Sequence, residues 1–327
     1  MRHASVIVSA CVLGSCALLT SLDDLRGSSD AAFDGTGSDV QSDAPTSDGP
    51  SEAATACDLT QDFGTPVAVA ELNTPADDGS ARLTHDELTV YFQRWPSLDA
   101  GVTNGIGGSY DLFTATRPTT TSAFGTTTTL ALDTASTEND PTVTGDVLTL
   151  YFSSDRAGSN GLDIWAATRG SLTSDFVAQS PLASPINSDQ DDSQAYVMPD
   201  GFTLYFASTR NSSSELFRAT RTGATPFTLD MMAFPSTIND FNDSEDPVVT
   251  LDELTLFFSS ARTGNTDVFV ATRASTSVPF GTPTALSSVN SVATDHPTWI
   301  SDDGCRLYID SDRDGSRDIF VATRPPL

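Results

Sequence analysis

The sequence predicts an all-β fold, a five-bladed β-propeller closed by an N-terminal strand, and three observations support this prediction. The tripeptide Ala-Thr-Arg occurs five times, in steps of 52, 52, 52 and 51 residues, and ends at Arg117, Arg169, Arg221, Arg273 and Arg324. An alternating apolar run precedes each copy, and turn residues separate the runs without any helical period. Repeats of roughly 40–50 residues with four strands are typical of propeller blades, which stack into a ring because one small sheet cannot bury both of its faces.

Each repeat supplies four runs of strand length, which in the second copy are residues 141–144, 148–154, 163–169 and 176–186. The fifth copy has only three, but Phe63-Gly64-Thr65-Pro66 matches Phe280-Gly281-Thr282-Pro283 at the fourth run of copy four. We therefore expect residues 63–73 to complete the last blade and close the ring, which removes its exposed sheet edges. The expected propeller is residues 57–327, with blades near 77–133, 137–188, 192–240, 243–291 and 295–324 plus 63–73.

The repeat pattern is best preserved in copy two, where it runs through Pro141, Asp146, Tyr151, Phe152, Ser154, Arg156, Gly158, Asp163 and Ile164. It resembles the WD-like repeat of TolB-type periplasmic β-propeller proteins, and the resemblance covers nearly all of residues 57–327. This resemblance implies an envelope-located propeller that binds partners, and it implies no shared reaction. Copy one departs from the pattern at residues 93–96 and copy three at Asn211, and a tether takes the place of TolB's N-terminal domain. TolB's own partner contacts are therefore not carried over.

The N-terminal residues 1–15 are typical of an export signal, because Arg2 and His3 precede a charge-free run that extends to Thr20. Leu13-Gly14-Ser15-Cys16 resembles the lipobox of bacterial lipoproteins, and this resemblance implies a lipid on Cys16. Residues 16–56 are rich in Ser, Asp, Gly and Ala and are expected to form an acidic disordered tether. We expect a lipid-anchored protein of the cell envelope, on the periplasmic or surface side of the outer membrane, with a secreted protein as the alternative.

The charge balance limits the kinds of partner. The chain has 44 acidic residues against 16 basic ones, all Arg, and a net charge of −28. Such a protein repels phosphate backbones and anionic lipid head groups. We therefore expect no nucleic-acid partner, a membrane contact only through the lipid anchor, and a monomer whose partner is a protein, a peptide or a glycan.

Two cysteines follow the predicted tether. Cys305 lies in the second strand of the closing blade, and Cys57 lies shortly before the strand assigned to the same blade. An exported protein matures in an oxidising compartment, so we expect a disulfide across the seam of the ring. Two unpaired thiols are the alternative.

Acidic residues gather where one blade leads into the next, among them Asp140, Asp192, Asp246 and Asp295. The loops expected on the same face carry Arg94, Arg156, Arg210, Arg262 and Arg313. The structural interpretation is that each acid pairs with an Arg or caps a turn. The functional interpretation is a ring of carboxylates that binds a basic peptide, a sugar or a cation. No cofactor or metal site is assigned. Calcium bound by carboxylate oxygens stays an alternative, but the sequence contains no twelve-residue calcium-binding loop.

The first copy contains the longest insertion, residues 93–110, which holds Trp95 and Tyr110. Loops on a rigid scaffold concentrate binding residues, and aromatic side chains are good anchors. Trp95 and Tyr110 are therefore candidate binding residues, with a surface insertion of no function as the alternative.

Catalysis has few candidate residues, because the chain has three histidines and only His296 lies near the expected channel. His296 aligns, through the proline that follows it, with Asp140 and Asp246 of the sister copies, and it is a further candidate binding residue. No catalytic residue is assigned. The sequence favours a non-catalytic binding platform, and the alternative is a secreted glycan-active hydrolase that uses inward carboxylates.

Overall fold

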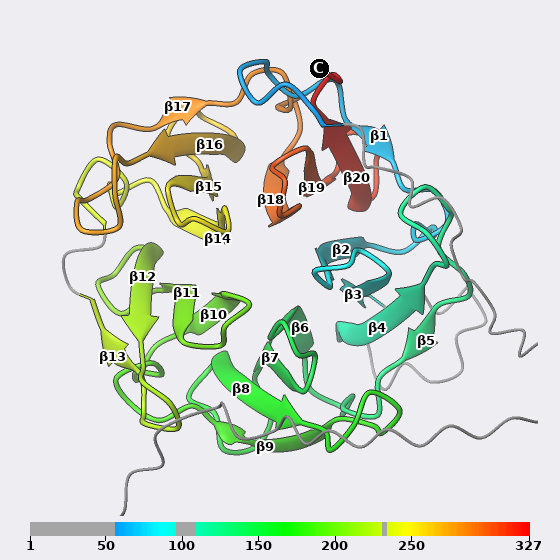
Figure 1. Ribbon diagram of the computed structural model, residues 1–327. Coiled ribbons are helices and arrows are strands. Elements are labelled where there is room, and N and C mark those ends of the chain that lie inside the picture. The colour runs from blue at the N-terminus through cyan, green and yellow to red at the C-terminus, as the bar shows by residue number, and fades with distance from the viewer. Residues whose placement is uncertain (1–55, 96–108, 231–233) are drawn as a thin grey trace, which may run out of the picture. The chain divides into compact units, whose positions relative to one another are not determined.

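The computed structural model describes residues 56–95, 109–230 and 234–327, so Cys16 and the predicted tether lie outside the described residues. These residues form twenty β-strands in five antiparallel sheets of four strands, arranged as a ring (Figure 1). The prediction of an all-β, five-bladed propeller is confirmed. Within the described ranges, the chain has no helix of the length and apolar character needed to cross a membrane.

In four blades the strands follow the chain from the axis outward, and in the fifth the outermost place is taken by β1 from the N-terminal segment (Figure 1). The innermost strands are β2 (Asp78–Leu83), β6 (Glu138–Val143), β10 (Asp192–Val197), β14 (Ser244–Val249) and β18 (Asp295–Ile300). The second strands are β3 (Thr89–Arg94), β7 (Thr149–Ser154), β11 (Thr203–Ser208), β15 (Thr255–Ser260) and β19 (Arg306–Ser311). The third strands are β4 (Asp111–Thr116), β8 (Asp163–Thr168), β12 (Glu215–Thr220), β16 (Asp267–Thr272) and β20 (Asp318–Thr323).

The outermost strands are shorter than the sequence indicates. They are β5 (Thr128–Thr129), β9 (Val177–Pro181), β13 (Thr228–Leu229), β17 (Thr284–Ala285) and β1 (Val67–Ala68). A buried Phe lies one to four residues before each of them: Phe124, Phe176, Phe227, Phe280 and Phe63.

The apolar runs of the repeat form the second strands, and they are apolar on both faces. In β7, for example, Tyr151 is 1% exposed and its neighbour Phe152 is 0% exposed. Successive side chains of a strand point to opposite faces of its sheet, so both faces here must be covered. Each blade packs between two others, and this explains why Tyr-Phe pairs recur with the repeat.

The Arg of the Ala-Thr-Arg tripeptide supports the fold in all five blades. Its guanidinium lies over the ring of the Phe that precedes the outermost strand. The distances to the ring centre are 4.5 Å for Arg117–Phe124, 4.4 Å for Arg169–Phe176, 4.5 Å for Arg221–Phe227, 4.3 Å for Arg273–Phe280 and 4.1 Å for Arg324–Phe63. The same guanidinium donates a hydrogen bond to a carbonyl in the turn between the first two strands of its blade. Because Phe63 repeats this contact, the N-terminal segment occupies the place of a regular fourth strand.

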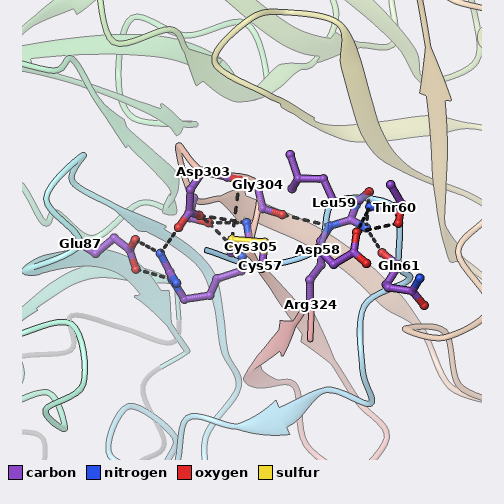
Figure 2. Close-up of a disulfide and its surroundings, with 12 residues drawn as sticks. Cys57, Asp58, Leu59, Thr60, Gln61, Glu87, Asp303, Gly304, Cys305 and Arg324 are labelled. Atoms are coloured by element: carbon purple, nitrogen blue, oxygen red, sulfur yellow. Dashed lines mark hydrogen bonds and ion pairs between the residues drawn. A yellow bond between two sulfur atoms is a disulfide. The ribbon is translucent and has the colours of Figure 1, made fainter. Parts of the chain in front are cut away.

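The ring closes at this segment as the sequence predicts. Strand β1 pairs antiparallel with β20, with Val67 opposite Val321 and Ala68 opposite Phe320. A disulfide joins Cys57 to Cys305, 248 residues away, and Figure 2 shows it beside the turn that contains Gly304. The predicted disulfide is confirmed.

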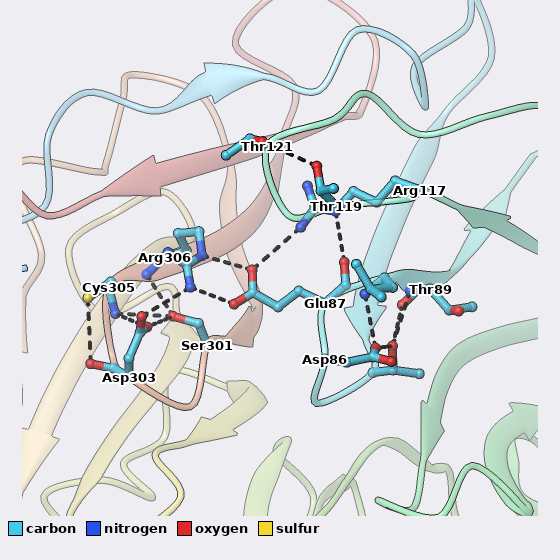
Figure 3. Close-up of polar contacts among 12 residues, drawn as sticks. Asp86, Glu87, Thr89, Arg117, Thr119, Thr121, Ser301, Asp303, Cys305 and Arg306 are labelled. Carbon is cyan, nitrogen blue, oxygen red and sulfur yellow. Dashed lines mark hydrogen bonds and ion pairs between the residues drawn. The ribbon is translucent and has the colours of Figure 1, made fainter. Parts of the chain in front are cut away.

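An ion-pair cluster links the first and last blades at the same end of the ring (Figure 3). Glu87, in the first turn of blade one, accepts hydrogen bonds from Arg306 of the fifth blade, one of them 2.8 Å long from Nε. Arg117 of blade one contacts the same carboxylate at 3.4 Å and donates from Nε to the Glu87 carbonyl at 2.8 Å. The closing blade is therefore held to blade one by charge as well as by packing.

Candidate functional site

The two kinds of loop singled out by the sequence lie at one end of the propeller. The strands of a blade alternate in direction, so the connections between blades and the loops between second and third strands share the end at which the innermost strands begin. We call this end the acidic face. It carries the solvent-exposed carboxylates of Asp155, Asp189, Asp191, Asp243, Asp312 and Asp314.

The repeated Arg residues of this face pair with the repeated acids. Arg210 contacts Asp192, and Arg313 contacts Asp295; both carboxylates are 0% exposed. The same Arg side chains donate to a carbonyl of the connection from the preceding blade, as Arg313 does to Val289 at 2.8 Å. Asp192 and Asp295, two of the candidate binding residues, therefore lie in the framework that joins the blades and not on its surface.

Hydrogen bonds between neighbouring blades continue all the way around the axis, and we call this series the axial ring. Three of its five links are backbone N–H groups that donate to a side chain of the preceding blade: Asp140 to Gln93 Oε1 (2.9 Å), Gln194 to Ser153 Oγ (3.2 Å) and Asp246 to Gln194 Oε1 (3.4 Å). The fourth joins Nδ1 of His296 to Asp246 Oδ2 (2.8 Å). The fifth closes the series, with the backbone N–H of Ser80 donating to Asp310 Oδ2 (2.9 Å). A bulge in each innermost strand turns the backbone toward these partners, since Ser80, Asp140, Gln194 and Asp246 all have φ near +50°.

The charges of the axial ring are close to balanced. Its carboxylates are Asp140, Asp246 and Asp310, each less than 9% exposed. The cationic groups that interact with them are His296, Arg317 and the buried Arg82. Arg317 lies 3.3 Å from the second ring nitrogen of His296 and 3.6 Å from Asp310. His296 and Arg317 are paired with carboxylates, as buried charges usually are, whereas Nε and Nη1 of Arg82 have no hydrogen-bond partner among the described residues.

The pKa values follow from this arrangement. Burial and the charge of Asp246 raise the pKa of Asp140 to about 6, against the hydrogen bond from Ser80. Burial and the nearby charge of Arg317 lower the pKa of His296, but the hydrogen bond and charge of Asp246, with the charge of Asp310, raise it to about 9. His296 is therefore protonated at neutral pH, and its charge lowers the pKa of Asp246 in spite of burial.

The sequence alignment of His296 was wrong by one residue. In the sheet, His296 pairs with Asp310 just as Asn139 pairs with Ser153 and Glu245 with Ser259. Pro297 therefore occupies the place of Asp140 and Asp246. Proline cannot adopt the positive φ of those residues, so blade five forms its bulge differently. The prediction had matched His296-Pro297 to Asp140-Pro141 and Asp246-Pro247, which is one residue out of register.

Of the axial ring, the sequence analysis identified only Asp140, Asp246 and His296. It missed the other residues of the links, which are Ser80, Gln93, Ser153, Gln194 and Asp310, and also the nearby cations Arg82 and Arg317. Asp310 stands where two other second strands have Ser153 and Ser259, so its departure from the repeat was the available signal.

Trp95 and Tyr110 come together at the edge of the acidic face. Their rings meet edge to face with centres 5.1 Å apart, and Trp95 is 40% exposed. Tyr110 is half-buried, and burial raises the pKa of its hydroxyl. The segment 96–108 between them lies outside the described residues. Two further apolar side chains of this face were missed from the sequence: Phe241 and Val292, in successive blade connections, are 94% and 101% exposed.

The opposite end of the channel holds a narrow pocket. Arg82, Tyr196 and Trp299 line it together with the turns that contain His85 and Asp302, whose side chains are hydrogen-bonded. Its free volume is about 40 Å³, which is enough for a few water molecules and too small for a sugar ring.

Comparisons with known proteins support the propeller fold and assign the chain to no family. The chain matches no protein-family model. It also matches no curated protein sequence. Solved structures of similar fold include Zg3597, a family 117 glycoside hydrolase produced by the marine bacterium Zobellia galactanivorans, with 9% identity, a TM-score of 0.52, and coverage of 80% of this chain and 90% of that one.

Two further solved structures are similar in fold. A glycosyl hydrolase from Bacteroides ovatus is 14% identical at a TM-score of 0.50, with 84% of this chain and 99% of that chain covered. TolB from Acinetobacter baumannii is 13% identical at a TM-score of 0.48, with 78% of this chain covered. The match spans 56% of the length of that TolB. At such identities the likeness shows the propeller fold alone, because one fold supports many functions.

Proposed function

We propose that this protein is a non-catalytic binding platform of the bacterial cell envelope that recognises its partner on the acidic face. The observation that carries the proposal is the Trp95–Tyr110 pair, an aromatic contact 40% exposed at Trp95 on a scaffold of five packed blades. Aromatic side chains held on a rigid surface are common anchors of binding energy.

The partner that fits this surface is a basic segment of a protein or peptide, or a glycan with cationic groups. The axial carboxylates already have cationic partners, whereas the carboxylates on the outside of the face are exposed. Exposed carboxylates attract a basic partner over a distance and raise its association rate at low salt. Phe241 and Val292 add apolar area between these charges.

The test is binding by the purified protein as bait in an envelope extract, with a glycan array as the second screen. Trp95→Ala is expected to weaken binding of the captured partner by about 1–3 kcal/mol while stability hardly changes. Phe202→Ala is the matched control, since Phe202 is 43% exposed and precedes β11 at the other end of the blade. Equal binding by the Trp95 and Phe202 variants would contradict recognition on the acidic face.

The location in the envelope is proposed on the lipobox-like residues that end at Cys16. Replacing Cys16 with Ser is expected to release the protein from the membrane fraction or to leave its signal uncleaved. Unchanged processing and membrane association in this variant would instead favour secretion or an uncleaved anchor.

The second candidate function is a glycan-active hydrolase, and one observation favours it. Asp140, with a pKa raised to about 6, neighbours the ionised Asp246, a combination found in acid and base or nucleophile pairs. Their low exposure, 5% and 7%, argues against substrate access. Release of reducing sugar from a polysaccharide panel, lost in both Asp140→Asn and Asp246→Asn, would establish the hydrolase; the binding platform predicts no release.

A further inference from the structure

The connection between blades one and two differs from the other four. Each of those four contains an Asn whose side chain makes two hydrogen bonds to one residue of the third strand. Its Oδ1 accepts from the backbone N–H of that residue at 2.8–3.0 Å, and its Nδ2 donates to the carbonyl of that residue at 3.0 Å. The four are Asn73, Asn187, Asn239 and Asn290. In the first connection the residue is Asp133, which accepts from the Leu112 N–H at 2.9 Å. An ionised carboxylate has no hydrogen to donate in return.

The substitution brings a third carboxylate to a place that already has two. Asp111 begins strand β4 and Glu138 begins strand β6. One carboxylate oxygen from each of Asp111, Asp133 and Glu138 lies within 4.8 Å of the others. The nearest cation in an ion pair with this group is Arg156, 3.0 Å from Glu138. One guanidinium leaves an excess of about two negative charges when all three acids are ionised.

Asp111 is the residue of this cluster whose surroundings indicate that a cation binds here. It is 0% exposed, and in the part of the chain that the structure describes neither of its carboxylate oxygens has a hydrogen-bond partner. The acids at the same place in the other blades each accept at least one hydrogen bond from their own loop, and they are Asp163, Glu215, Asp267 and Asp318. A buried carboxylate without any partner is costly, so it is expected to have a partner of opposite charge.

We propose that Asp111, Asp133 and Glu138 form a calcium site at the junction of blades one and two. Calcium prefers oxygen ligands at about 2.3–2.6 Å, so two ligands on opposite sides of the ion lie about 4.8 Å apart. The three carboxylates meet this limit. A divalent ion matches the excess charge, and water completes the six to eight ligands that calcium takes. The site lies in the connection between blades and is separate from the axial ring.

A protonated Asp133 is the competing explanation. Burial, together with the charges of Asp111 and Glu138, raises the pKa of Asp133 to about 7 against the Leu112 hydrogen bond and Arg156. Burial and the charge of Glu138 raise the pKa of Asp111 to about 6. A protonated Asp133 can donate to the Leu112 carbonyl as Asn does in the sister connections, and no cation would then be needed.

The experiment titrates the purified full-length protein, freed of metal with a chelator, with CaCl₂ alone, by calorimetry and by the shift of the melting temperature. We expect one saturable site per chain and a higher melting temperature in calcium. Asp133→Asn restores the residue of the four sister connections, so the fold should be kept while calcium affinity falls at least about tenfold, because affinity follows the number of charged ligands. Asp111→Asn should have the same effect.

Asp189→Asn is the matched control, since it removes one exposed charge from the same face outside the cluster. It should bind calcium like the unchanged protein. No saturable binding by the unchanged protein, or equal weakening by Asp189→Asn and Asp133→Asn, would overturn the proposal. Failure of this test would leave the partner-binding function untouched, because that function depends on Trp95.

Discussion

The protonated His296 is expected to make the stability of the propeller fall as the solution becomes alkaline. Nδ1 of His296 bonds the carboxylate of Asp246 on the neighbouring blade, and the charge of Asp310 adds to the attraction for the proton. The pKa of His296 is about 9 in the folded protein and close to 6.5 in an unfolded chain. The folded state therefore binds the proton more tightly. The stabilisation is fully present below pH 6.5 and is lost as the pH rises through about 9.

The size of this effect follows from the difference between the two pKa values. Each pKa unit corresponds to about 1.4 kcal/mol, so a difference of roughly 2.5 units amounts to about 3 kcal/mol of unfolding free energy. Asp140 also has a raised pKa, but it titrates lower, at about 6. Asp133 titrates at about 7, inside the range from pH 6.5 to 9.5. Both carboxyl groups are kept in a variant that replaces only the histidine, so the difference between the two proteins reports on His296.

The assay is urea denaturation at several pH values between 6.5 and 9.5, at constant ionic strength, for the unchanged protein and for His296→Gln. Gln keeps a donor for Asp246 and carries no titrating proton. We expect the variant to be less stable at pH 6.5, and the unchanged protein to lose about 3 kcal/mol more than the variant across this range. Parallel curves for the two proteins would refute the reasoning.

Three further predictions concern the framework and share the same urea assay. Reducing the Cys57–Cys305 disulfide, or replacing both cysteines with Ser, should cost about 2–5 kcal/mol, because the bond closes a long loop in the unfolded chain. Phe63→Ala should cost about 3–5 kcal/mol, since the ring is 2% exposed and stacks on the last repeat Arg. Asn239→Asp should cost about 1–3 kcal/mol, because its donor to the Leu216 carbonyl is lost. Unchanged unfolding midpoints in any of these would show that the contact concerned does not hold the ring.

The sequence predicted those features that repeat or that match a repeat. The five Ala-Thr-Arg tripeptides fix the number of blades, and the likeness of residues 63–66 to 280–283 predicts where the ring closes. Cys57 and Cys305 could be paired because closure places them in one blade. Each of these inferences depends on spacing along the chain, which is visible without coordinates.

The axial ring could not be predicted in the same way, because it depends on register. The bulges in the innermost strands decide which side chains face a neighbouring blade, and a bulge moves the pairing by one residue. His296 and its partner Asp310 therefore could not be brought together from spacing alone. The cluster of Asp111, Asp133 and Glu138 could not be predicted from the sequence either, because these residues come from a strand, a connection and the next blade.

Departures from the repeat are the most informative residues in a propeller of this kind. A position that is equal in all five blades, such as the Arg of the tripeptide, makes the same contact five times and needs no further function to explain it. Asp133 replaces the Asn of the four sister connections, and Trp95 belongs to an insertion that the sister blades lack; both lie on the acidic face near blade one. A charge or an exposed aromatic ring that the framework does not use costs stability or solubility unless something binds it. The first blade and its acidic end are therefore where ligands and partners should be sought.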